Sequence, residues 1–232
     1  MDAFEAMKSR HGVLRFKSAP VEQEKIERVL QAAVAAPSPA NTQPWAFVVV
    51  TDGTLARQVA EYLVQAQETF VFRHLLATPE PFIEHLLYLY DEFYDAPCFI
   101  VLCRHPRVDL APPEYTALVR DWELGALGAA MANLMAAATA LGLGTRWFGN
   151  PMMDENSELG RLLRIPADVE IVAVTPLGYH DEGQKERPVQ PLEAHTGFRR
   201  GDKYKLAALL EGKLALEDVV HYNEFGNTER GA

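Results

Sequence analysis

The sequence predicts an α/β (α+β) fold, in which helices flank both faces of one mixed central sheet. Apolar runs at 47–50, 96–103 and 170–178 are rich in β-branched residues and predict buried strands. Segments 21–36, 55–70 and 114–141 lie between these runs and are predicted to be helices. Strands that alternate with helices favour a sheet covered on both faces.

The composition limits the class of protein. The 232 residues suit one domain with an extension, and 48% of them are hydrophobic, as a packed core requires. The net charge of −10 argues against a nucleic-acid partner, because phosphate neutralisation needs a basic surface. Neither a signal peptide nor a membrane-spanning apolar run is visible, so we expect no membrane partner and a cytoplasmic location.

The cysteine pattern agrees with a reducing compartment. The two cysteines, Cys98 and Cys103, are five positions apart within one predicted strand. Such odd spacing puts their side chains on opposite faces of the strand, so we expect no mutual disulfide. Two thiols without a disulfide framework suit the cytoplasm.

The N-terminal segment is predicted to begin with a short helix at 2–10, with Asp2 as its cap. A cluster of basic residues follows at Arg10, His11, Arg15 and Lys17. Taken alone, such a short basic run is a solvated turn. Pro20 then precedes the helix at 21–36, as helix starts allow.

A polar, proline-rich turn joins that helix to the first strand. Its sequence is Pro37-Ser38-Pro39-Ala40-Asn41-Thr42-Gln43-Pro44-Trp45. The prolines remove backbone donors and fix φ, while short polar side chains can bond either the backbone or a ligand. On single-sequence grounds it is also an ordinary helix-to-strand turn.

The segment 71–95 is dense in aromatic and aliphatic residues and is interrupted by Pro79 and Pro81. It fits either a core helix or a mobile cover over a ligand.

Within the apolar helix at 114–141, four small residues form one flat strip: Gly125, Gly128, Ala129 and Ala132. Such a strip allows another backbone to approach closely, from the same chain or from a second copy.

The second half of the chain carries further turn signals. Gly142 is a good helix stop, Thr145 to Phe148 is predicted to be a short strand, and Gly149 allows a close backbone approach. A helix is predicted at 157–163. Lys185 and Arg187 follow the last strand, in what is otherwise a solvated loop. A further helix is predicted at 203–210.

Several common catalytic motifs are missing from the sequence. No G-x-G-x-x-G follows a strand, and neither a G-x-x-x-x-G-K-[ST] loop nor a G-x-S-x-G elbow occurs. No His/Cys cluster has metal-ligand spacing. The chemistry must then come from a bound cofactor.

The turn at 36–45 resembles the A-P-S-x-x-N-x-Q-P-W signature of the FMN-dependent nitroreductase family, with every fixed position present. The resemblance spans about 5–192 and includes the Gly-Leu-Gly at 142–144 and the Leu-Gly-Tyr at 177–179. It implies an FMN-binding domain at 1–192, an intertwined homodimer around the helix at 114–141, and a C-terminal extension at 193–232. We expect this extension to wrap the partner subunit.

The resemblance also implies a set of cofactor-binding residues. Arg10 and His11, with Lys185 and Arg187, would hold the FMN phosphate, and a backbone N–H of Gly149 would face flavin N5. Gly12 stands where Ser is common, and Leu14 stands where a cation near the flavin pyrimidine is usual. The remaining members of the set are Pro37, Ser38, Pro39 and Asn41, of which Ser38 and Asn41 are expected to reach FMN from the opposite subunit, and Phe148, near the ring.

The implied activity is ping-pong hydride transfer from NAD(P)H through FMN to a small aromatic or conjugated acceptor, such as a nitroaromatic, a quinone or an enone. Flavin N5 carries the hydride, so we assign no catalytic acid. Alternatives with the same fold are a flavin destructase, a reductive dehalogenase and a flavin-dependent dehydrogenase. A non-catalytic FMN-binding protein is the alternative from another class.

Overall fold

The computed structural model describes residues 1–74, 95–149, 158–181 and 219–220, with side chains in the third helix described up to 66. All helices and strands named below belong to one unit, made of Met1–Ala77 and His85–Lys185. The predicted boundary at 192, most of the segment 71–95, the helix at 203–210, and Lys185 and Arg187 lie outside the described residues.

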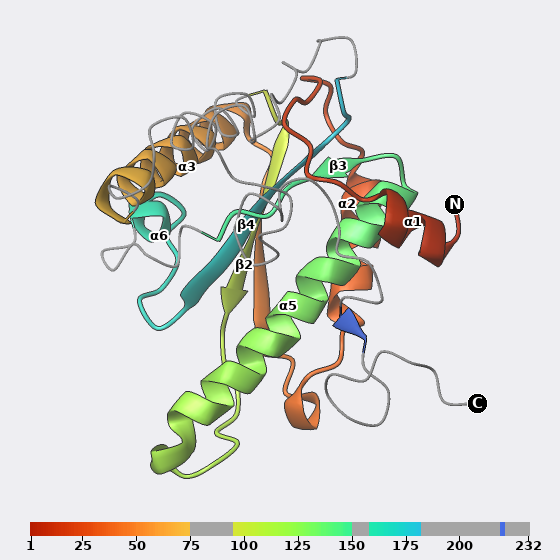
Figure 1. Cartoon of the computed structure of the whole chain (residues 1–232). Coiled ribbons are helices and arrows are strands. Elements are labelled where there is room, and N and C mark those ends of the chain that lie inside the picture. The colour runs from red at the N-terminus through yellow and green to blue at the C-terminus, as the bar shows by residue number, and fades with distance from the viewer. Residues whose placement is uncertain (75–94, 150–157, 182–218, 221–232) are drawn as a thin grey trace, which may run out of the picture. The chain divides into compact units, whose positions relative to one another are not determined.

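A four-stranded sheet forms the centre of this unit, in the order β1-β2-β4-β3 (Figure 1). Its strands are β1 (Trp45–Val50), β2 (Cys98–Arg104), β3 (Gly144–Thr145) and β4 (Glu170–Gly178). The helices are α1 (Ala3–Ser9), α2 (Gln23–Val34), α3 (Gly53–His74), α5 (Thr116–Ala140) and α6 (Glu158–Leu162), with 3₁₀ turns η1 (Pro39–Asn41) and η2 (Pro113–Tyr115).

The named strands pair antiparallel, and a parallel bridge between Gly12 and Thr145 extends the sheet beyond β3. The register defines two ends of the sheet. At one end Trp45 of β1 lies opposite Arg104 of β2, which lies opposite Glu170 of β4. At the other end the first residues of β2 lie beside the last residues of β4, next to β3. We call these the Trp45 end and the β3 end.

The hydrophobic core lies in two layers, one on each face of the sheet. Helices α2 and α5 pack with Ile100 and Leu102 on one face, while α3 and α6 pack with Phe99 and Val101 on the other. The alternation follows from the two-residue period of a strand. Figure 1 shows α3 and α6 on the opposite side of the sheet from α5 and α2. The predicted fold class is confirmed.

The cysteines follow the same alternation. Cys98 belongs to the α5 side of the core and Cys103 to the α3 side, and both thiols are free. Burial raises the pKa of each thiol to about 12. The expected absence of a mutual disulfide is confirmed.

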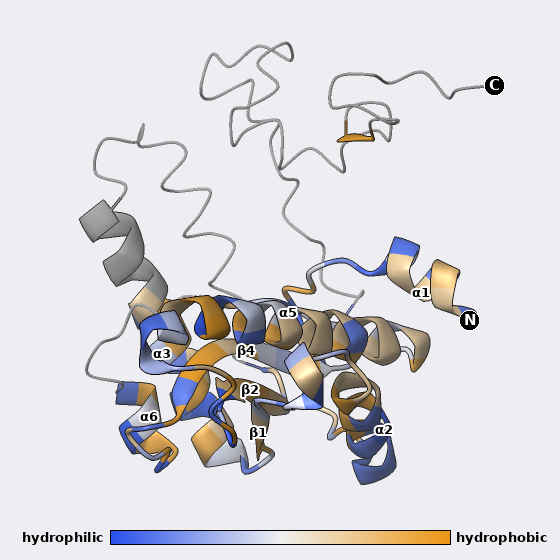
Figure 2. Cartoon of the chain, turned by 90° about the horizontal axis from the view of Figure 1, so that it is seen from below, coloured by the Kyte–Doolittle hydropathy of each residue, from blue (hydrophilic) through white to orange (hydrophobic). Residues whose placement is uncertain are grey.

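Local chemistry explains where α1 begins and which face of α2 is buried. The Asp2 side chain accepts the Glu5 N–H at 2.9 Å, and the Glu5 carboxylate accepts the Asp2 N–H at 3.3 Å, which forms a capping box. On α2, residues Ile26, Val29 and Ala33 are buried at helical spacing between charged residues. Figure 2 shows this contrast as hydrophilic and hydrophobic stretches on the α2 ribbon.

Two predicted strands differ from the structure. β1 was expected to be buried on both sides, but Phe47, Val48 and Val49 are only half-buried. The reason is that β1 stands at the outer position of the described sheet, with β2 as its partner there. The strand predicted at 145–148 is broken: β3 ends at Thr145, and Phe148 makes a separate antiparallel bridge to Val174.

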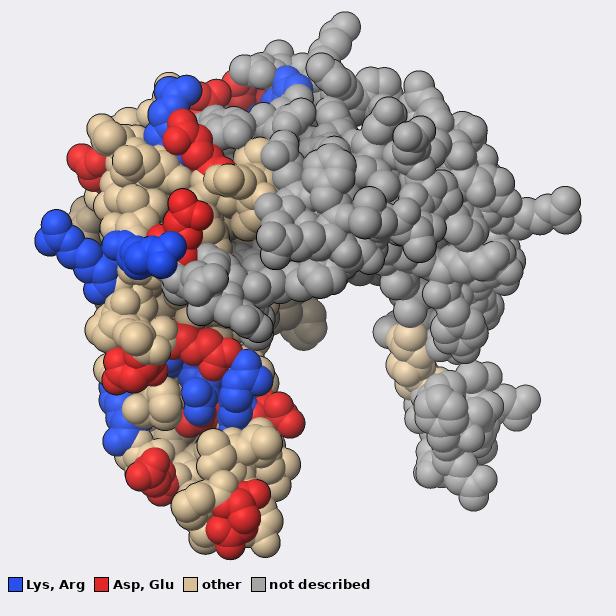
Figure 3. Space-filling view, turned by 90° about the vertical axis from the view of Figure 1, so that its left-hand side faces the viewer, with Lys and Arg blue, Asp and Glu red and all other residues tan. Residues whose placement is uncertain are grey.

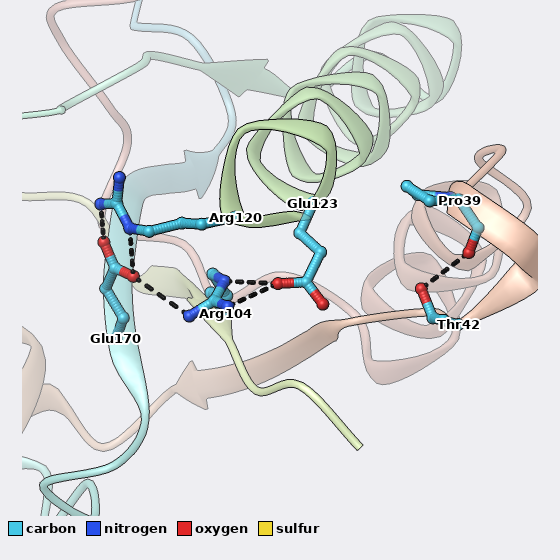
Figure 4. A network of polar contacts seen from close by, with 6 residues as sticks. All are labelled: Pro39, Thr42, Arg104, Arg120, Glu123 and Glu170. Carbon is cyan, nitrogen blue, oxygen red and sulfur yellow. Dashed lines mark hydrogen bonds and ion pairs between the residues drawn. The ribbon is translucent and has the colours of Figure 1, made fainter. Parts of the chain in front are cut away.

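A network of ion pairs ties α5 to the Trp45 end of the sheet (Figure 4). Arg104 donates from Nε to Oε2 of Glu123 at 2.6 Å, and its Nη1 lies 3.6 Å from Oε2 of Glu170. Arg120 of α5 pairs with the same Glu170 carboxylate. The Glu123 side chain is 1% exposed, so α5 carries a buried charge that only Arg104 neutralises in the described chain.

Three further findings concern the described residues as a whole. On the face shown in Figure 3, basic and acidic residues are interspersed over the described part. Among the described residues, no helix combines the length and the hydrophobicity needed to cross a bilayer. The same residues contain no group of three or more His, Cys, Asp or Glu side chains able to hold a metal ion.

Candidate functional site

The segment 10–17 is fixed to the β3 end of the sheet by backbone hydrogen bonds. The Val13 N–H donates to the Thr145 carbonyl at 2.9 Å, and the Lys17 N–H donates to the Tyr179 carbonyl at 2.8 Å. The Asp181 N–H donates in return to the Arg15 carbonyl at 3.1 Å. A basic stretch predicted as a turn is therefore held like an extra strand, beside β3 and the residues after β4.

Two glycines make this close approach possible. A Cβ on Gly144 would lie 2.6 Å from Cγ2 of Val13, and one on Gly178 would lie 3.0 Å from Cδ1 of Phe16. Side chains at these positions would push the segment away from the sheet. The Gly-Leu-Gly and Leu-Gly-Tyr motifs thus place residues 10–17.

Tyr179 anchors the chain that follows β4. Its hydroxyl donates to Oε2 of Glu22 at 2.5 Å and accepts from Nζ of Lys25 at 2.5 Å. The tyrosine hydrogen bond lowers the pKa of Glu22 and raises the pKa of Lys25. Residues 178–181 are thereby held to the start of α2.

Four nitrogen-bearing residues belong to the segments that these bridges join, and we call them the basic cluster: Arg10, His11, Arg146 and His180. The His11 and His180 rings meet edge to face with centroids 5.7 Å apart, and Nδ1 of His11 lies 3.1 Å from the Ser9 carbonyl. Arg146 passes beside Gly12, where a Cβ would lie 3.8 Å from its Cγ. Two of the four residues are arginines and carry a permanent positive charge, in a chain of net charge −10.

The turn after β3 lies next to the basic cluster. Phe148 is 1% exposed and packs in the α3 side of the core, while its N–H and carbonyl bond Val174, both at 2.9 Å. Gly149 is half-buried, with Nε1 of the exposed Trp147 at 3.4 Å from the position of an added Cβ. Leu14 is half-buried. Phe148 therefore supports the turn from within the core.

The proline-rich turn at 37–43 has an unusual backbone. Ala40, Asn41 and Gln43 have φ values of 45°, 57° and 50°, in the left-handed region that non-glycine residues rarely occupy. The Gln43 N–H donates to Oγ of Ser38 at 3.0 Å, which fixes one strained residue. Asn41 is exposed and Ser38 is half-buried. Strain of this kind is typical of functional sites.

Arg107 clamps the same turn from the loop after β2. Its Nη1 donates to the Gln43 carbonyl at 2.6 Å and its Nη2 to the Trp45 carbonyl at 3.1 Å. These two bonds span Pro44, so they hold the strained residue and the first residue of β1 together. Sequence reasoning did not single out Arg107, because its partners are backbone atoms brought near only by the β1–β2 pairing.

The structure places most of the predicted site residues in two separate sets, at opposite ends of the sheet. Arg10, His11, Gly12 and Leu14 belong to the segment bridged to Thr145 at the β3 end, whereas Pro37, Ser38, Pro39 and Asn41 precede Trp45 at the other end. Phe148 and Gly149 lie between these ends, because Phe148 bridges Val174 at mid-length of β4. The two ends are six residue steps of β2 apart, or roughly 20 Å at ~3.4 Å per residue. One copy of the chain does not bring the two sets together.

Sequence reasoning also missed Arg146 and His180. Each lies within three residues of a position that was recognised, Gly149 and the Leu-Gly-Tyr motif. The missing signal was the pairing of residues 12–16 with β3 and His180, which joins distant segments. The one signal in the sequence was that Arg146 is a basic residue in a predicted strand close to the glycine turn at Gly149.

Comparison with known proteins agrees with this architecture. The family model described as "Nitroreductase family" matches residues 7–179. A protein of Archaeoglobus fulgidus named as an NADH dehydrogenase/NAD(P)H nitroreductase is 31% identical over 172 residues, which cover 74% of this chain and 81% of that one. An iodotyrosine deiodinase of Thermotoga neapolitana is 26% identical, over 80% of this chain and 92% of its own.

Solved structures show the same fold. A nitroreductase with bound FMN from Bacteroides fragilis superposes with a TM-score of 0.58 at 20% identity, covering 82% of this chain and 95% of that one. The resemblance found from the turn at 36–45 is confirmed over most of the described chain. This chain belongs to the nitroreductase family.

Proposed function

We propose that the chain is an FMN-dependent oxidoreductase that takes a hydride from NAD(P)H and passes it to a small aromatic or conjugated acceptor. The observation that carries the proposal is the basic cluster at the β3 end of the sheet, with the Arg146 guanidinium carbon 5.6 Å from the centre of the Phe148 ring, next to Gly149. When bound, FMN supplies hydride transfer at N5. Family membership and the FMN-bound relative support this choice of cofactor.

The donor chemistry of the described residues fits a phosphate-bearing cofactor. Two guanidinium groups and two imidazoles suit a phosphate monoester, since Arg forms paired hydrogen bonds to phosphate oxygens. Arg10 and His11 would hold the phosphate together with Lys185 and Arg187. The Gly149 N–H would face the reactive edge of the flavin, with Phe148 beneath that turn. Gly12 and Leu14 would line the cofactor between these two places.

We further propose a homodimer, because one copy keeps Ser38 and Asn41 at the opposite end of its sheet from Arg10. A second copy can supply the missing set. The face of α5 supports this: Leu118 and Trp122 are 43% and 50% exposed. An added Cβ on Gly125 or Gly128 would meet nothing within 4 Å in this chain. Leu118, Trp122 and Gly125 are four and three residues apart, which is the spacing of residues that face a second packed helix.

In the proposed reaction the protein orients the cofactor and the substrates and shields them from water. Pro37, Ser38, Pro39 and Asn41 of one copy would face the cofactor held by the basic cluster of the other. The strained backbone at 40–43 is fixed by Arg107 and Ser38, so its polar groups need little reorganisation on binding. NAD(P)H and the acceptor would use one position in turn, which requires ping-pong kinetics. No side chain is assigned a proton-transfer role.

A reductive dehalogenase is the second candidate. Relatives named as iodotyrosine deiodinases support it, including the one from Thermotoga neapolitana at 26% identity. A flavin destructase, a flavin-dependent dehydrogenase and a non-catalytic FMN-binding protein are the further alternatives.

The first experiment is a visible spectrum of the purified protein and a titration of the apoprotein with FMN. We expect a yellow protein that binds FMN, whereas a colourless protein that takes up no added FMN would overturn the proposal.

The second experiment is anaerobic stopped-flow reduction by NADH and NADPH, followed by reoxidation with a panel of acceptors: a nitroaromatic, a quinone, an enone and an iodophenol. Iodide release as the fastest reaction selects the dehalogenase, and reaction of reduced FMN with oxygen that consumes the flavin selects the destructase. FMN binding without reduction of the bound flavin by either nucleotide selects the non-catalytic protein or the dehydrogenase.

A further inference from the structure

Arg146 has a position that its place in the sequence does not predict. It follows the last residue of β3, Thr145, whose carbonyl accepts the Val13 N–H and which bridges to Gly12. A Cβ on Gly12 would lie 3.8 Å from Cγ of Arg146 and 3.9 Å from its Nη1. The side chain therefore runs across the bare Cα of Gly12, from the stem to the guanidinium.

Neighbouring groups hold this side chain on a rigid base. The Arg146 N–H donates to Oγ1 of Thr175 in β4 at 3.2 Å. The guanidinium carbon lies 5.6 Å from the centre of the Phe148 ring, within the range of a cation–π contact. Thr175 and Phe148 are both buried, so the base on which Arg146 rests belongs to the core.

The absence of a side chain on Gly12 has a chemical consequence. A serine here would present a hydroxyl donor to a ligand beside Arg10 and His11. In this chain that space lies against Nη1 of Arg146, a charged donor with a planar fork. The fork adds a permanent cation beside Gly12, two residues after Arg10, from a different segment of the chain.

We propose that Arg146 binds the phosphate of FMN as a bidentate donor, in place of the side chain that Gly12 lacks. This inference rests on the proposed function and deepens it, because it adds a binding residue to the FMN site. The guanidinium supplies two parallel N–H donors to two phosphate oxygens, and Arg10 and His11, which precede Gly12 in the chain, bind the same group. The competing role for Arg146 is packing alone, with its aliphatic stem covering Gly12.

Comparing FMN with riboflavin separates these roles, because riboflavin has the same ring and ribityl chain without the phosphate. The variants are Arg146→Gln and Arg146→Lys, with Arg161→Gln as the control. Arg161 is exposed on α6, so the control removes the same charge elsewhere. Circular dichroism and the Tm of each apoprotein confirm folding, and fluorescence quenching of each flavin at fixed salt gives the two dissociation constants.

For Arg146→Gln we expect FMN affinity to fall on the order of 10- to 100-fold, as for a lost charge-assisted hydrogen-bond pair, with riboflavin affinity changed less than about 3-fold. Arg146→Lys keeps the charge without the planar fork, so its FMN affinity should lie between those of the wild type and Arg146→Gln. Arg161→Gln should leave both affinities unchanged. Equal losses for the two flavins, or an unchanged FMN affinity, would overturn the assignment.

The outcome in which the wild-type protein binds neither flavin refutes the proposed function, and a phosphate titration then decides on Arg146 separately. Inorganic phosphate should raise the Tm of the wild type and of Arg161→Gln, but not that of Arg146→Gln. An equal shift in all three proteins removes Arg146 from any phosphate site.

Discussion

Removing Arg104 should destabilise the protein far more than removing a surface charge. Glu123 lies on α5 with a side chain that is 1% exposed, and both Nε and Nη2 of Arg104 lie 2.6 Å from its Oε2. Its other oxygen, Oε1, has no hydrogen-bond partner in the part of the chain that the structure describes. Arg104→Ala would leave this buried carboxylate without its counter-charge, which costs about 3–5 kcal/mol of unfolding free energy.

The size of the effect can be measured on the apoprotein. For a chain of this length about 1 kcal/mol lowers the Tm by roughly 2–4 °C, so we expect a fall of about 6–20 °C. Urea unfolding gives the free-energy change independently. Arg120→Ala is the matched control: its side chain is 41% exposed, so its pairing with Glu170 should contribute no more than about 1 kcal/mol.

A double variant tests the cause. Replacing both partners, Arg104→Met with Glu123→Leu, removes the charge together with its counter-ion and should restore most of the lost stability. If Arg104→Ala costs less than about 1 kcal/mol, or if the double variant is no more stable than the single one, the buried charge is not the reason for the effect.

Four further outcomes can be checked. Gly144→Ala places a Cβ 2.6 Å from Cγ2 of Val13 and should cost about 1–3 kcal/mol in urea unfolding, whereas Gly125→Ala meets nothing within 4 Å in the same chain and should not lower the stability of a monomer. Trp122→Glu should convert the proposed dimer to monomer in light scattering, with Glu61→Gln on α3 as a control that leaves the mass unchanged; a wild-type monomer would contradict the proposed interface. Burial raises the pKa of the Cys98 and Cys103 thiols from 9.0 to about 12, so on raising the pH the thiols of the unfolded chain ionise first, and the thiols' contribution to the stability of the fold is complete below pH 9 and is lost as the pH rises toward 12. Cys98→Ala and Cys103→Ala should each reduce this alkaline fall in Tm, and an unchanged slope of Tm against pH would refute the linkage. Leu14→Lys should raise the midpoint potential of bound flavin by stabilising the anionic reduced ring, and spectroelectrochemistry that shows no upward shift would remove Leu14 from the neighbourhood of the ring.

The sequence by itself determined the elements and the family. Strand and helix periodicities place β2, β4, α2 and α5 within a few residues, because burial on one or both faces leaves a period that is visible along the chain. The odd spacing of Cys98 and Cys103 fixed their opposite faces for the same reason. The motif at 36–45 identified the nitroreductase family because its fixed positions are contiguous.

Tertiary structure decided what depends on partners distant in sequence. The pairing of residues 12–16 with β3 and His180 brought Arg146 to Gly12, and the β1–β2 pairing brought Arg107 to the strained turn. The half-exposure of β1 came from its outer position in the described sheet. The register also put Arg10 and His11 at the opposite end of the sheet from Ser38 and Asn41. Hydrophobic periodicity reports which face of an element is buried, but not which element covers it, and so the composition of the site had to come from the fold.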